Sequence, residues 1–196
     1  MAKESNFKNM TLTLFVVSLM ASTSLGFVYS FTKGPIENAQ NAKINSALSK
    51  VLPEFDNQPA AEKFTREVDG GILTFYPATK GGERIGVAVQ TFTKNGFSGQ
   101  IDLMVGFLAN GSINAIEVVA HKETPGLGDK METAKSNFSV QFQGKNPESF
   151  KLSVKKDGGD VDAITASTIS SRAYCDAVIR AYNALKKEGE NNEPAN

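Results

Sequence analysis

The sequence predicts an α+β fold, with an antiparallel or mixed sheet and helices at both ends of the chain. Three observations predict it: an uncharged run near the N-terminus, four short β-prone runs between residues 72 and 120, and a helical periodicity near the C-terminus. A chain of 196 residues has room for one domain of ordinary size plus terminal extensions. We therefore expect a single core.

The first element is an uncharged run over residues 11–31, interrupted only by glycine and small hydroxylated residues. A helix of this length reaches about 30 Å and can cross the hydrocarbon core of a bilayer. Aromatic residues lie near its end, where they suit a membrane interface. The run predicts a single-span transmembrane anchor over 11–31, ended by Lys33-Gly34-Pro35.

A cleaved signal peptide is the alternative to an anchor. Its apolar region would be Leu12 to Ala21, with Ser22 and Ser24 as the small residues of a cleavage site. Apolar residues continue past that site to Phe31, which favours an anchor that is retained. Both readings export the rest of the chain.

Charge at the ends of the run predicts its orientation. Lys3 and Lys8 precede it, which favours a cytoplasmic N-terminus over residues 1–10. The domain over residues 32–188 is then extracytoplasmic, on the periplasmic or outer side of the inner (cytoplasmic) membrane. The polar residues 189–196 are expected to form a disordered tail.

Periodicity predicts the elements that follow. Apolar residues recur at helical spacing over residues 36–52, which indicates an amphipathic helix continuing from the anchor and stopped by Pro53. Asn110-Gly111 is typical of a tight hairpin. Alternate apolar residues from Ile101 to Phe107 predict one buried strand face. The predicted strands are 72–76, 84–93, 100–108 and 112–120.

The C-terminal part begins with two short apolar runs, 138–142 and 150–154. A final helix is predicted over residues 170–187, with an apolar stripe that faces the sheet and Gly189 as its cap.

Composition excludes several functions. Lysine plus arginine and aspartate plus glutamate each total 21, so no net positive charge is present to attract nucleic acid. Cys175 and His121 are the only residues of their types. A zinc or iron–sulfur site of thiolates and a multi-histidine metal site are therefore not expected. Any redox chemistry must come from an organic cofactor.

Two segments differ from ordinary scaffold. The segment 121–130 reads HKETPGLGDK, and its proline and glycines permit a loop whose backbone N–H groups approach a flat ligand. The segment 162–171 reads DAITASTISS and precedes the last helix, whose free N–H groups could bind phosphate near Thr168. An ordinary turn and helix capping by Ser170 or Ser171 are the alternatives.

Together these segments resemble the FMN-binding G subunit of the Rnf electron-transport complex and its relative, the C subunit of the sodium-translocating NADH:quinone reductase. In that family a flavin transferase recognises Asp-x-x-Ser/Thr-Gly-Ala-Ser/Thr and joins FMN by a phosphoester to the last hydroxyl. Asp162 and Thr165 match this pattern, and Thr168 is the implied acceptor. Ala166 and Ser167 depart from it, because they replace the usual Gly and Ala, and the Ser167 hydroxyl competes for modification.

The compact chain favours the Rnf-type protein over its quinone-reductase relative. The resemblance implies that electrons pass between reduced ferredoxin and NAD through several membrane subunits, with this flavin as one relay. Turnover by the isolated chain is not expected. The loop residues implied to cover the flavin ring are Glu123, Thr124, Gly126, Leu127 and Gly128.

Two other functions compete with this reading. One is a non-redox, membrane-anchored binding module that displays the glycine-rich loop to a partner. The other is a hydrolase that uses Ser167, Ser170 or Ser171 with His121, and it is disfavoured because no nucleophile elbow is present. For His121 itself, a structural hydrogen-bonding role is favoured.

Overall fold

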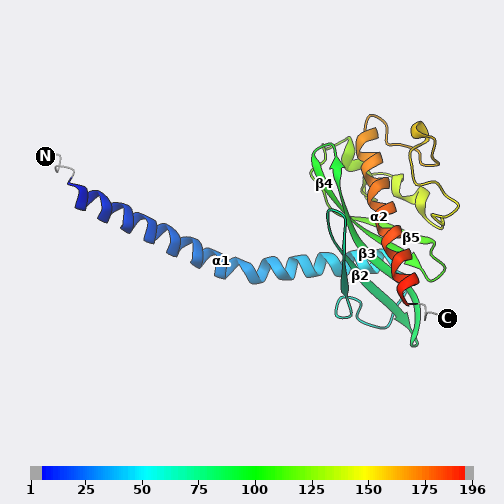
Figure 1. Ribbon diagram of the computed structural model, residues 1–196, viewed down its shortest axis with the longest axis horizontal. Helices are drawn as coiled ribbons and strands as arrows, with labels where there is room; N and C mark the ends of the chain where they lie inside the picture. Colours follow the sequence, from blue (N-terminus) through cyan, green and yellow to red (C-terminus); the bar gives the residue numbers. More distant parts are fainter. Residues whose placement is uncertain (1–5, 193–196) are drawn as a thin grey trace. The chain divides into compact units, whose positions relative to one another are not determined.

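The computed structural model describes residues 6–192 of the chain. Helix α1 (Phe7–Val51) comes first, followed by five strands and the C-terminal helix α2 (Thr168–Asn192) (Figure 1). The chain divides between Ala42 and Lys43 into two compact units. The first unit holds most of α1, and the second holds the sheet and α2.

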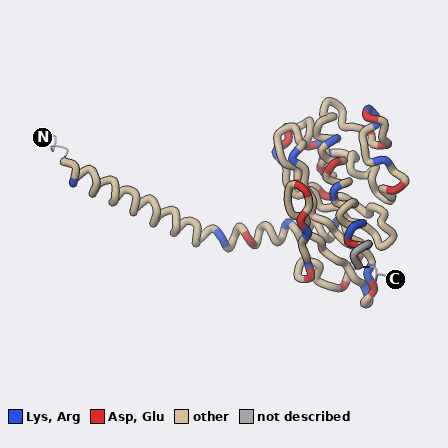
Figure 2. The backbone as a smooth tube through the Cα atoms, in the orientation of Figure 1, with Lys and Arg blue, Asp and Glu red and all other residues tan. Residues whose placement is uncertain are grey.

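Within the first unit, α1 is long and apolar enough to cross a membrane, and its side chains are exposed. Figure 2 shows the uncharged stretch of this helix between Lys8 and Lys33. The uncharged run ends before Lys33-Gly34-Pro35, but the helix does not, because α1 continues through Pro35 into the amphipathic helix predicted to follow the anchor. A proline removes one i→i−4 hydrogen bond, and here the turns on both sides preserve the helix.

All five strands form one antiparallel sheet in the order β1-β2-β3-β4-β5. Four of them match the predicted runs, and the Asn110-Gly111 turn joins β4 to β5 as expected. The first strand was missed because FTREV carries three exposed polar residues, and an edge strand buries little. The strands are β1 (Phe64–Val68), β2 (Gly71–Lys80), β3 (Glu83–Gly96), β4 (Gly99–Leu108) and β5 (Ile113–Ala120).

Each face of the sheet packs against a different helix. Leu103, Val105 and Phe107 belong to the large core cluster that α2 covers, as the alternation along this strand predicts. Met104 points to the other face, where it packs with Leu48 from the end of α1. The sheet is therefore buried on both faces over its centre.

Gly106 permits close packing at the second face. A Cβ atom there would overlap the carbonyl oxygen of Val51, the last residue of α1. The side-chain amide of Asn114 donates to the same carbonyl at 2.8 Å. The end of α1 is thus fixed on the sheet, and residues 43–51 belong to the folded domain.

Helix α2 lies across the sheet (Figure 1) and buries the predicted stripe, which includes Ala173, Tyr174 and Ala177. It passes through Gly189 and ends at Asn192, so the predicted cap at Gly189 is wrong, and residues 189–192 of the predicted tail are helical. A Cβ atom at Gly189 would meet no other group, so glycine affects the helix there only through its low helix propensity. Residues 193–196 of the predicted tail lie outside the described residues.

The connection between β5 and α2 is built from short 3₁₀ helices: η1 (Gly128–Met131), η2 (Phe138–Phe142) and η3 (Lys155–Asp157). The predicted apolar run 138–142 is η2, and Phe138 and Phe142 pack edge-on against each other and contact the Tyr174 ring. The run 150–154 contributes only an isolated bridge, from Val154 to Val161.

Candidate functional site

Three segments that are distant in sequence enclose a cleft of about 320 Å³. They are the β3–β4 turn, the loop after β5 and the segment that leads into α2. This volume lies within the range of small-molecule sites. The lining residues are Phe97, Glu123, Thr124, Leu127, Gly128, Ala166, Ser167, Thr168, Ile169 and Ser170.

Thr168 is the first residue of α2 and is half-buried at the cleft. The backbone N–H groups of Thr168, Ile169 and Ser170 have no hydrogen-bond acceptor among residues 6–192, whereas Ser171 N–H donates to Ser167 O at 3.0 Å. Free N–H groups at a helix N-terminus, together with the helix dipole, favour an anion.

Ser171 fixes the start of this helix. Its hydroxyl accepts a hydrogen bond from the N–H of Ile164 at 2.9 Å and donates to the carbonyl of Ser167 at 3.0 Å. Because α2 begins at Thr168, neither Ser170 nor Ser171 is the cap considered from the sequence, and Ser171 instead stabilises the turn before the helix. Ser170 instead points to the loop after β5.

Ala166 has φ +60° and is the only described non-glycine residue with a positive φ. For an L-residue this left-handed conformation costs roughly 1–2 kcal/mol, whereas glycine adopts it freely. The turn into α2 therefore suits glycine, which is the residue that the recognition pattern usually has here. The alanine places backbone strain on the wall of the cleft.

Glu123 joins the three segments. Its side chain is buried, with only 5% exposed. The carboxylate accepts a hydrogen bond from Ser98 N–H at 2.9 Å on one oxygen and from Ser170 Oγ at 2.5 Å on the other. Because Ser98 follows β3 and Ser170 lies in α2, one carboxylate holds the loop against both.

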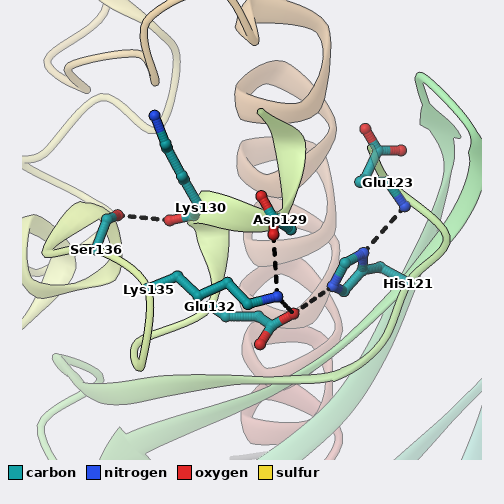
Figure 3. A network of polar contacts seen from close by, with 7 residues as sticks. All are labelled: His121, Glu123, Asp129, Lys130, Glu132, Lys135 and Ser136. Carbon is teal, nitrogen blue, oxygen red and sulfur yellow. Dashed lines mark hydrogen bonds and ion pairs between the residues drawn. The ribbon is translucent and has the colours of Figure 1, made fainter. Parts of the chain in front are cut away.

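A polar network holds the same loop from behind (Figure 3). The N–H of Glu123 donates to His121 Nδ1 at 3.0 Å, and the other ring nitrogen lies 2.6 Å from Glu132 Oε1. Lys135 Nζ lies 2.9 Å from the same Glu132 oxygen and 3.0 Å from Asp129 Oδ2. His121 therefore has the predicted structural role in this fold.

These contacts shift the acidity of the network. Hydrogen bonds from His121 and then Lys135 lower the pKa of Glu132. The hydrogen bond from Lys135 lowers the pKa of Asp129, and the two carboxylates raise the pKa of Lys135. The ionised forms of Glu132, Asp129 and Lys135 are thus favoured.

Six of the nine predicted site residues line the cleft, and three do not. Asp162 is exposed and pairs with Lys155 at 2.8 Å, while Thr165 and Gly126 are exposed near the cleft. The six are Glu123, Thr124, Leu127, Gly128, Ser167 and Thr168. Asp162 and Thr165 are therefore accessible to another protein but are not among the cleft-lining residues.

Sequence reasoning missed Phe97 and Ile169, which line the cleft although each is about half exposed or more. Both carried a weak signal. Phe97 is an aromatic residue in the two-residue turn between Gly96 and Gly99, and Ile169 lies outside the buried stripe of α2. With Leu127, they give the cleft a largely apolar mouth.

A larger depression of about 830 Å³ lies between the β1–β2 turn and α2. Its wall is mostly polar and includes Glu67, Asp176 and Arg180. It lacks the helix N-terminus and the apolar mouth of the smaller cleft. Within residues 6–192, no group of three potential metal ligands is present. The smaller cleft is therefore the candidate site.

Comparison with known proteins identifies the domain that contains the cleft. The FMN-binding domain family matches residues 96–183, a range that contains all three segments of the cleft. The match assigns an FMN-binding domain to the part of the chain that forms the cleft, and so defines the protein as a flavoprotein.

Relatives that match nearly the whole chain show which family of flavoproteins it belongs to. The G subunit of the ion-translocating oxidoreductase complex of Shewanella loihica is 33% identical over 99% of this chain and 97% of its own length. The corresponding proteins of Vibrio cholerae and Pseudomonas aeruginosa are 31% and 35% identical, over 91% and 87% of this chain and 92% and 84% of their own lengths. The chain belongs to this family of G subunits.

Proposed function

We propose that this protein is the electron-transfer subunit of a membrane-bound, ion-translocating oxidoreductase complex of Rnf type, and that it carries FMN in a phosphoester bond to Thr168. Family membership supports the role in a complex, and the FMN-binding domain supports the cofactor. The position of Thr168 supports the bond, because this hydroxyl opens α2 at the cleft.

The N-terminus of α2 suits the phosphate of FMN. The unpaired N–H groups of Thr168, Ile169 and Ser170 would donate to phosphate oxygens, and the helix dipole would favour the negative charge. Thr168 is in this reading a tether, since no described side chain that could act as a base contacts its hydroxyl. The transferase is then expected to supply the catalytic groups.

The apolar mouth suits the flavin ring. Phe97, Leu127 and Ile169 offer apolar contacts, and Thr124 adds a hydroxyl. Bound FMN supplies the electron chemistry, while the protein supplies position and electrostatics. Because Leu127 and Phe97 are substantially exposed, the mouth remains accessible to a partner that exchanges electrons.

The exposed position of Asp162 and Thr165 suits recognition by a flavin transferase during maturation. The uncharged part of α1 is proposed to anchor the chain in the inner membrane, with residues 1–10 cytoplasmic and the flavin domain on the periplasmic or outer side. The other membrane subunits of the complex would then pass electrons between ferredoxin and NAD through this flavin.

Substitution at the acceptor tests the proposal. The full-length chain is expressed with a flavin transferase, denatured, and inspected for fluorescence in the gel. Wild type and Ser167→Ala should retain covalent flavin, Thr168→Ser should retain part, and Thr168→Ala should lose it. Peptide mass spectrometry should place the FMN mass on Thr168.

Two results would contradict different parts of the proposal. FMN found on Ser167 or Thr165 would reject the acceptor and leave the flavoprotein role intact. An active transferase with no flavin on the wild-type chain would reject the covalent flavin and favour a non-redox, anchored binding module.

A further inference from the structure

The cleft contains one ionisable side chain, Glu123, among its ten lining residues. Every other lining side chain is apolar, a hydroxyl or glycine. The electrostatic effect of the cleft wall on a bound ligand therefore depends chiefly on this carboxylate and on the N-terminus of α2. The two acidic residues behind the loop, Asp129 and Glu132, are not among the cleft-lining residues and pair with a cation, Lys135.

The hydrogen bonds of Glu123 are those of a carboxylate. Both oxygens accept, one from a backbone N–H and the other from a hydroxyl at 2.5 Å. No nitrogen of a lysine, arginine or histidine side chain described by the structure lies within 4.0 Å of this carboxylate. The donors in direct contact with the carboxylate are neutral, so a buried negative charge remains on the cleft wall.

Close packing fixes the position of this charge. A Cβ atom on Gly128 would lie 2.6 Å from one carboxylate oxygen, and a Cβ atom on Gly96 would lie 2.8 Å from the other. The backbone N–H of Glu123 donates to His121 Nδ1, which fixes the backbone at Glu123 (Figure 3). The carboxylate thus has little freedom to turn toward solvent or away from a ligand.

We propose that Glu123 is the residue that sets the reduction potential of the flavin: its fixed negative charge lowers that potential. The inference rests on the proposed function, since it requires FMN in this cleft. Each electron that enters the flavin ring adds one negative charge unless a proton follows. A carboxylate held at the wall opposes this added charge and so favours the oxidised cofactor.

The sharpest test is Glu123→Gln, because it removes the charge and keeps the shape. The amide oxygen can accept from Ser98 N–H, and the amide nitrogen can donate to Ser170 Oγ, which is able to accept. We expect the equilibrium constant for one-electron reduction to rise about tenfold, because one partly screened charge is removed. This corresponds to about +59 mV in the midpoint potential.

The measurement is a spectroelectrochemical titration of the flavin-loaded, full-length chain in detergent. Glu83→Gln is the matched control, since it removes the same charge from an exposed residue at the start of β3, and it should leave the potential unchanged. Glu123→Asp keeps the charge and should remain closer to wild type than Glu123→Gln does.

Ser170→Ala should shift the reduction potential of the flavin in the direction opposite to Glu123→Gln. It keeps the carboxylate but removes the hydroxyl dipole that offsets its charge, so the potential should fall. If Glu123→Gln does not retain flavin, the direction of the potential shift in Ser170→Ala tests the role of Glu123 instead. A change in fold alone does not predict opposite shifts for the two variants.

The outcomes separate the inference from the proposed function. A wild-type chain without flavin contradicts the proposed function. A flavin-loaded wild type whose potential is unchanged in Glu123→Gln overturns the role of Glu123. A rise or no change in Ser170→Ala also counts against it, whereas a rise in Glu123→Gln and a fall in Ser170→Ala confirm it.

Discussion

The packing around Glu123 makes Gly128 the most sensitive position of the cleft. A Cβ atom there would lie 2.6 Å from Glu123 Oε2 and 2.7 Å from Ser170 Oγ, the two oxygens that now share a hydrogen bond at 2.5 Å. Ordinary contact begins near 3.4 Å. In Gly128→Ala each oxygen must therefore retreat by roughly 0.7–0.8 Å, which breaks the bond between them.

Two overlapping costs determine the loss of unfolding free energy expected in Gly128→Ala. Overpacking of a tight site costs about 1–3 kcal/mol, and loss of a hydrogen bond to a charged group costs about 1.5–3 kcal/mol. Because both describe the same displacement, we expect a combined loss of about 2–3 kcal/mol. For a domain of this size the Tm should fall by roughly 5–10 °C.

The assay is thermal unfolding of the full-length chain in detergent, with flavin content measured in parallel. Gly189→Ala is the control, because its added methyl group meets open space on α2 and should cost nothing. Gly128→Ala should also carry less flavin, since the loop and α2 separate at the cleft. A Tm within about 2 °C of wild type would refute the argument that these three segments pack around one carboxylate.

Three further predictions concern single residues. Ala166→Gly should raise the unfolding free energy by up to about 1 kcal/mol in denaturant titrations, because it relieves the positive φ; a loss would contradict the strain. Tyr174→Phe should be neutral or stabilising by about 1 kcal/mol, since the buried Tyr174 hydroxyl has no hydrogen-bond partner among residues 6–192, and a clear loss would reveal one. Glu132 has a lowered folded pKa, so its ionised form stabilises the fold above its ordinary pKa of 4.5, and this contribution is lost as the pH falls through the folded value. Glu132→Gln should therefore be less stable than wild type at neutral pH, with the gap closing in melts carried out at successively more acidic pH, and a constant gap would contradict the linkage.

Elements with a local signal could be predicted from the amino-acid order alone. An uncharged run predicts a span, alternation from Ile101 to Phe107 predicts a buried strand face, and the stripe of α2 predicts a buried helix. These patterns repeat with the period of the backbone, so each segment specifies its own structure. Thr168 was also proposed from sequence as the acceptor, through the recognition pattern and its place near the start of the last helix.

The construction of the cleft, in contrast, depends on contacts between distant segments. Glu123 contacts Ser98 and Ser170, which lie 25 and 47 positions away along the chain, and no periodicity predicts such pairs. The positive φ of Ala166 arises because the chain must turn sharply into α2. The exposed mouth residues Phe97 and Ile169 were also not predicted. An apolar residue outside a buried stripe can be assigned to a binding site only when its neighbours in space are known.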